Sequence, residues 1–144
     1  MSNPVFYISA YFEKDRSEYY SKLLAISEED NWNAWIEYFL RGIIEQAKEN
    51  IKKVKMIREL HDKLGKDIAS LTRSHNSFQI LDFLFHRPIF TGSNFSSQTD
   101  IAKPSAARIL KLLLDKKIVY QVKPAQGRKP ALYCFPELLK LIQE

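Results

Sequence analysis

The sequence predicts a mainly α-helical fold, in which N-terminal helices including one long helix precede a smaller α+β region. Apolar residues with helical spacing run through positions 32–71 without a proline. The second half of the chain instead alternates short helical segments with short β-like segments. These two patterns divide the chain into a helical region over residues 1–74 and a compact domain over residues 75–144.

The first half is expected to be helical throughout. Residues 15–26 read as an amphipathic helix, which places along one side Tyr19, Tyr20, Leu23, Leu24 and Ile26. Asp30 or Asn31 then suits the N-terminal cap of the next helix.

The apolar stripe of residues 32–71 predicts a helix of about 40 residues, roughly 60 Å long if it is unbroken. Gly42 and Gly65 weaken this helix slightly, and Gly65 is the candidate position for a break. A helix of this length cannot bury its stripe against one short helix. A partner is therefore expected, with a second copy of the chain among the candidates.

Beyond a polar joint at residues 73–77, the elements become short. A helix is expected from near Ser77 until just before Pro88, because proline disfavours helix in the residue that precedes it. Residues 88–91 are β-like. Residues 92–98 then form a weak polar helix, for which Thr91 is the expected cap.

A stronger helix is predicted from about Lys103 to Lys116, with Pro104 tolerated in its first turn. Residues 118–122 and 131–135 alternate in polarity and are rich in β-formers, so they read as two strands joined by a basic loop. A short helix ends the chain. This element order is that of a winged helix-turn-helix, in which the third helix enters the DNA major groove and the wing contacts the backbone or the minor groove.

The charge of the chain is concentrated in this second region. Residues 1–76 carry 12 basic and 12 acidic side chains, whereas residues 77–144 carry 10 basic and 5 acidic ones. Such asymmetry indicates a polyanionic partner, the alternative being a solvated lysine-rich face. We expect double-stranded DNA to be bound by outward residues of the third helix and of the wing, among which Ser105, Arg108 and Gln126 are best suited to read bases: Lys103, Ser105, Arg108, Lys111, Lys123, Gln126, Arg128 and Lys129.

Other classes of function find little support in the residues. No window approaches the roughly 18 apolar residues of a membrane helix, and the first residues do not resemble a signal peptide, so a cytoplasmic location without membrane contact is expected. The single cysteine, Cys134, rules out an internal disulfide and is expected to be a small buried thiol. The sequence contains no metal-ligand cluster, phosphate-binding loop or Ser/His/Asp arrangement, so we expect no catalytic residue, metal or cofactor.

Two stretches also carry a resemblance to a known family. The first reads PVFYISAYFEKDRSEYYSKLLAISEEDNWNAWIEYFLRGIIEQA, with matching positions at Phe6, Tyr7, Ile8, Ser9, Phe12, Glu13, Arg16, Glu18, Tyr19, Tyr20, Trp32, Trp35, Ile36, Tyr38 and Phe39. The second reads FTGSNFSSQTDIAKPSAARILKLLLDKKIV, with matching positions at Thr91, Phe95, Ile101, Lys103, Pro104, Ser105, Ala106, Arg108, Leu110, Lys111, Leu113 and Ile118. They resemble the segment after the catalytic loop of Fic family proteins and the winged helix that many of them carry at the C-terminus.

The resemblance implies a relationship to enzymes that transfer AMP from ATP to a hydroxyl through a His-Pro-Phe-x-Asp/Glu-Gly-Asn-Gly-Arg loop, whose histidine is the general base. That loop does not occur in this sequence, where His61, His75 and His86 stand in other contexts. The chain is thus similar to the C-terminal part of a Fic protein without its catalytic core.

The leading expectation is a non-enzymatic DNA-binding protein, a transcriptional regulator that dimerises through its N-terminal helices. The dimer contact is assigned to four residues that would pack against the core in a full-length relative: Trp32, Trp35, Phe39 and Ile43. Two alternatives stay open. One is an accessory or truncated C-terminal part of a Fic-type enzyme, docking on a separately encoded core; the other is an interaction module that no longer binds DNA.

Overall fold

The computed structural model describes residues 8–72 and 76–143. Phe6 and Tyr7, which contribute to the family resemblance, lie outside these ranges, as do His75 and part of the expected polar joint. The chain forms two compact units, Met1–Val54 and Lys55–Glu144, and one helix, α3 (Trp32–Thr72), contributes to both. The domain boundary expected between residues 74 and 75 stays a prediction. The two units are defined by which residues pack together, and they divide within α3 rather than at the end of a helix.

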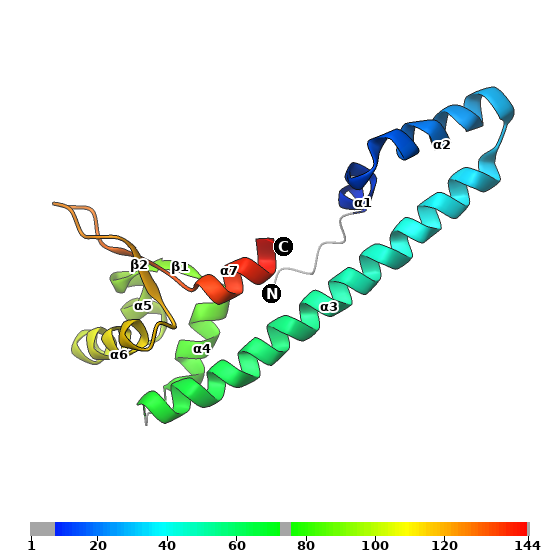
Figure 1. Ribbon diagram of the computed structural model, residues 1–144. Coiled ribbons are helices and arrows are strands. Elements are labelled where there is room, and N and C mark those ends of the chain that lie inside the picture. The colour runs from blue at the N-terminus through cyan, green and yellow to red at the C-terminus, as the bar shows by residue number, and fades with distance from the viewer. Residues whose placement is uncertain (1–7, 73–75, 144) are drawn as a thin grey trace. The chain divides into compact units, whose positions relative to one another are not determined.

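The N-terminal unit consists of α1 (Ser9–Lys14), α2 (Arg16–Glu29) and the first half of α3. Asp15 separates the two short helices and caps α2, because its carboxylate accepts a hydrogen bond from the backbone N–H of Glu18 at 2.9 Å. Figure 1 shows α2 and the start of α3 as the two arms of a helical hairpin. Tyr20 and Leu24, two of the apolar residues expected along one side of this helix, are exposed.

Aromatic rings hold α1 and α2 against α3. Phe12 contacts Tyr19, Trp35, Tyr38 and Phe39, with ring centroids 5.1–6.3 Å apart. This aromatic cluster buries Tyr38, and burial raises the pKa of its hydroxyl.

The predicted long helix is confirmed. Asn31 caps it, as its side-chain Oδ1 accepts a hydrogen bond from the N–H of Ala34 at 3.2 Å. The helix continues through Gly65, where an added Cβ would lie 3.2 Å from Cδ2 of Leu81, so glycine leaves room for the helix that packs there. Between Gln46 in the N-terminal unit and Leu64 in the C-terminal unit, α3 contains no buried residue.

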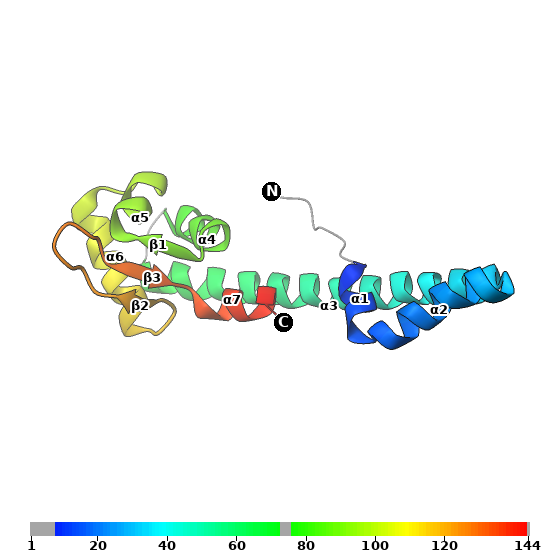
Figure 2. The same ribbon diagram turned by 90° about the horizontal axis from the view of Figure 1, so that it is seen from above.

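The C-terminal unit contains the last turns of α3 and the elements α4 (Ser77–His86), β1 (Ile89–Thr91), α5 (Gly92–Gln98), α6 (Lys103–Asp115), β2 (Tyr120–Lys123), β3 (Leu132–Cys134) and α7 (Pro136–Gln143). The three strands form an antiparallel sheet in the order β1-β3-β2. Figure 2 shows the connection between β2 and β3 projecting from this sheet as a wing. The predicted mainly α fold with a winged helix-turn-helix and a small β-wing is confirmed.

A shared apolar core fixes the helices of the C-terminal unit. Its side chains come from every helix of the unit and from the sheet, including Leu64, Ile68, Ile80, Leu84, Phe90, Phe95, Ile109, Leu113, Val119, Phe135 and Leu138. Phe83 packs its ring edge-on against Phe90 and Phe95, at 5.1 and 5.4 Å between centroids. The predicted inner face of α6 lies in this core, which turns the opposite face of that helix outward.

Caps define both ends of the helix-turn-helix. Thr91 and Asn94 form a capping box at the start of α5, in agreement with the predicted cap. At the end of α6, the N–H groups of Lys117 and Ile118 bond to the carbonyls of Leu114 and Leu113 at 2.9 and 3.0 Å. This is the Schellman arrangement, and Lys117 occupies its left-handed position with φ +57°.

Candidate nucleic-acid interface

The outer face of α6 carries the first half of the predicted site. Ala106, Ile109, Leu110 and Leu113 point into the core, and residues on the other side of the helix are exposed. Helical spacing puts Arg108 and Lys111 near the middle of that exposed face, with Lys103 and Ser105 towards its edges. The four side chains therefore lie on one accessible surface.

The wing carries the second half. Lys123, Gln126, Arg128 and Lys129 are all exposed. Gln126 and Lys129 close the tip through two backbone hydrogen bonds, each 3.0 Å long. Gly127, with φ +56°, is the first residue of the two-residue turn between them, a position that favours glycine. The turn leaves Arg128 at the tip of the wing.

The positive charges of this surface are not neutralised by their described neighbours. Six of the eight predicted residues are basic, and none of the six forms an ion pair with another residue of ranges 8–72 and 76–143. α6 ends at Asp115 and β2 begins at Tyr120, so the two basic elements are joined by a short connection within one unit. We call these eight residues the basic surface.

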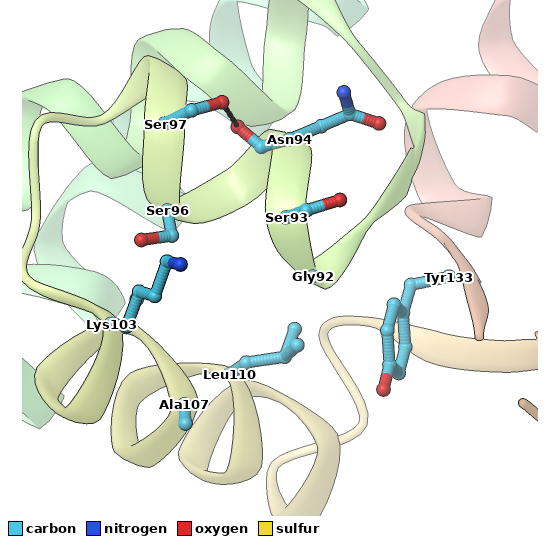
Figure 3. A pocket seen from close by; sticks show the side chains of 10 residues that line it. Gly92, Ser93, Asn94, Ser96, Ser97, Lys103, Ala107, Leu110 and Tyr133 are labelled. Carbon is cyan, nitrogen blue, oxygen red and sulfur yellow. Dashed lines mark hydrogen bonds between the residues drawn. The ribbon is translucent and has the colours of Figure 1, made fainter. Parts of the chain in front are cut away.

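An open hollow of about 860 Å³ borders the basic surface between α5 and α6. Figure 3 shows Lys103 and Tyr133 at its opposite ends, with serine side chains of α5 along one wall. Of these, Ser93 and Ser97 are exposed. The hydroxyl of Ser97 donates to the carbonyl of Asn94 at 3.3 Å and that of Ser93 lies 2.9 Å from Oγ1 of Thr91, so each would exchange this partner in order to donate to a phosphate oxygen. Sequence reasoning did not single them out, although the polar composition of residues 92–98 carried the signal.

The four residues assigned to the dimer contact lie along one face of α3 but differ in burial. Trp35 and Phe39 lie in the aromatic cluster of the N-terminal unit, and Ile43 is partly buried. Trp32 is exposed, and its indole Nε1 donates a hydrogen bond to Oδ1 of Asp30 at 3.0 Å. Packing by α1 and α2 thus occupies part of the predicted contact.

Within the part of the chain that the structure describes, no helix is sufficiently long and apolar to span a bilayer. No protein-family model matches the sequence. The function proposed below therefore depends on the residues of the basic surface and on their geometry.

Proposed function

We propose that the protein is a non-enzymatic DNA-binding protein, a transcriptional regulator that contacts duplex DNA through α6 and the wing. The observation that carries this proposal is the basic surface, in which six basic side chains, without an ion pair to any residue of 8–72 or 76–143, occupy the two elements that meet DNA in winged helices. Neutralising phosphates with these side chains releases counterions and supplies affinity.

The side chains of the basic surface suit two different tasks. Lysines are flexible point charges that suit phosphate, whereas an arginine carries a planar fork that can meet two acceptors of a guanine. Arg108, near the middle of the exposed face of α6, is placed to read a base edge. Arg128 at the wing tip suits a narrow minor groove.

The proposal is tested by fluorescence titration of the full chain with a duplex selected from a random library and with a scrambled duplex, each at two salt concentrations. Preference for the selected duplex and a steep loss of affinity with salt are expected. Absence of binding to any duplex at low salt would leave the basic surface as a solvated face.

A second candidate is an accessory part of a Fic-type AMP-transferring enzyme, as the family resemblance implies. The observation in its favour is uncovered apolar surface on α2, where Tyr20 and Leu24 are 64% and 55% exposed and could dock on a separate core. Incubation with labelled ATP and magnesium or manganese is expected to give no labelled protein with this chain alone. Clear self-modification would contradict the proposal that it is non-enzymatic.

A further inference from the structure

One face of α3 in the N-terminal unit is apolar and uncovered. Its residues recur at steps of three, four or seven positions, which keeps them on one side of the helix, and are each 49–57% exposed: Trp32, Ile36, Leu40, Ile44, Ile51 and Val54. Leu40 stands two residues from both Tyr38 and Gly42, a rotation of about 160° around the helix. Because Tyr38 and Gly42 face α1, these six residues, the α3 stripe, lie on the opposite side of the helix.

The size of the α3 stripe indicates a protein partner. Six half-exposed side chains leave on the order of 600 Å² of apolar surface, the upper end of what single domains usually expose. If a second copy covered this surface with its own stripe, on the order of 1,200 Å² in total would leave water, which reaches the lower limit of stable interfaces.

The charges along the chain favour one orientation of such a pair. Residues 28–45 contain five acidic and one basic side chain, whereas residues 46–63 contain six basic and three acidic ones. Parallel pairing would place each segment beside its own copy and bring like charges together. Antiparallel pairing places the acidic segment of one copy beside the basic segment of the other, which is the favourable arrangement.

Apolar positions of the α3 stripe fall near one another when a second copy of the helix runs alongside in the opposite direction. With the two-fold axis between Glu45 and Gln46, Leu40 of one copy faces Ile51 of the other, and Ile36 faces Lys55, the residue next to Val54. Next to the axis Ile44 faces Ala47, and at the ends of the pair Trp32 faces Glu59.

We propose that two copies of this chain pair antiparallel along the α3 stripe. The inference rests on the dimer that we expect for the DNA-binding protein, and it names the surface and orientation of that dimer. It differs from the contact expected from the sequence, since Trp35 and Phe39 face the chain's own α1 and α2 rather than the partner.

Cysteine cross-linking distinguishes the orientations. In a Cys134→Ser background, Ile36→Cys and Val54→Cys chains are oxidised separately and after mixing, and the products are identified by intact mass. Antiparallel pairing predicts several-fold more of the mixed disulfide than of either self-disulfide, because a disulfide needs Cα atoms within about 7 Å. Self-disulfides as abundant as the mixed one would overturn the orientation. Lys52→Cys, on another side of α3, is the matched control and should not cross-link.

Light scattering tests whether the partner is a second copy of the chain. The full chain should have about twice its 16.9 kDa monomer mass, and Leu40→Glu combined with Ile44→Glu should return it to the monomer. Since both side chains are already half exposed, the double variant should keep its helical circular dichroism. Phe78→Glu, an equally accessible apolar site in the C-terminal unit, should leave the dimer intact. If the wild-type chain is a monomer at micromolar concentration, the proposed dimer is contradicted.

The same proteins separate this inference from the DNA-binding proposal. An antiparallel dimer that binds no duplex would support the pairing and contradict the function. A monomer that binds a selected duplex would support the DNA-binding function and contradict the pairing.

Discussion

Tyr11 lies directly on the backbone of α3 at Gly42. An added Cβ on Gly42 would be 2.6 Å from Cδ1 and 2.9 Å from Cε1 of the Tyr11 ring. The ring also packs against Tyr38, at 5.6 Å between centroids. Glycine at this position therefore permits α1 to contact α3.

Gly42→Ala should destabilise the N-terminal unit, although alanine in a helix interior normally stabilises by about 1 kcal/mol over glycine. The methyl group forces the Tyr11 ring out of its contact. In a Tyr11→Ala background the same substitution should instead stabilise the protein. Chemical denaturation of the four proteins measures this double-mutant cycle, and equal effects in both backgrounds would contradict the contact.

The ion pair between Lys14 and Glu49 should stabilise the N-terminal unit at intermediate pH. This stabilisation should be lost at acidic pH and again at strongly basic pH. Nζ of Lys14 lies 2.7 Å from Oε1 of Glu49. This hydrogen bond lowers the pKa of Glu49 below its usual 4.5 and raises the pKa of Lys14 above its usual 10.5. The contribution of Glu49 is full above pH 4.5 and is lost as pH falls through its folded pKa. That of Lys14 is full below pH 10.5 and is lost as pH rises through its folded pKa.

Lys14→Gln is therefore expected to lower the melting temperature slightly at neutral pH, and this effect should shrink as the pH falls below 4.5 and Glu49 becomes protonated. Because both side chains are exposed, added salt should shrink the difference. A difference that persists at acidic pH would show that Lys14 acts through packing instead.

Lys117→Gly should stabilise the C-terminal unit. The φ of +57° at Lys117 is left-handed, a conformation that costs a residue with a side chain roughly 1 kcal/mol relative to glycine. An increase of about 4–8 °C in the melting temperature of a unit of this size is expected from thermal unfolding. Lys116→Gly, one residue earlier at φ −85°, is the control and should not stabilise.

Arg108→Ala should reduce both affinity and specificity. A side chain that contacts a base edge contributes roughly 1–3 kcal/mol to the binding free energy on its own site and less on other sequences. Titrations of the selected and scrambled duplexes measure the two losses separately. Equal losses on both would assign Arg108 to phosphate.

Lysines of the basic surface should behave differently from Arg108. Replacing Lys103, Lys111, Lys123 or Lys129 by alanine should weaken all duplexes about equally and reduce the salt slope by about 0.9 for each contact. Lys116→Ala is the matched control, because Lys116 caps α6 outside the basic surface. A control variant that behaves like the others would point to general electrostatic attraction.

Much of the C-terminal unit followed from local pattern. Proline at position 88, the cap at Thr91 and the periodicity of residues 103–115 are local signals, and the structure places element boundaries close to them. The same periodicity separated the inner and outer faces of α6. The pattern predicted helix throughout the first half but did not mark off α1, a separate six-residue helix with no side-chain cap at its N-terminus. Its formation depends on the packing of Tyr11 and Phe12 against α3.

The dimer contact that the sequence predicts, which stays a prediction, illustrates the same limit of local patterns. Apolar residues occupy more than one face of α3 between positions 32 and 54, so sequence spacing alone does not say which face the chain covers itself. Contacts with Phe12 and Tyr11, which are distant in sequence, decide it. Likewise, the continuity of α3 at Gly65 depends on the close approach of Leu81.

The stretch of α3 between Gln46 and Ile57 contains no buried residue and precedes the contacts that Ile57, Leu60 and His61 make with the C-terminal core, so its backbone hydrogen bonds should open more easily than the rest of the helix. An isolated helical segment of that length is marginal in water, since packing supplies most helical stability in proteins. Its backbone amides should therefore exchange with deuterium sooner than those on either side, while both cores stay folded. If a second copy covers Ile51 and Val54 as proposed, exchange in that part should slow as protein concentration rises, whereas exchange beyond Ile57, where the helix packs on the C-terminal core, should not depend on concentration.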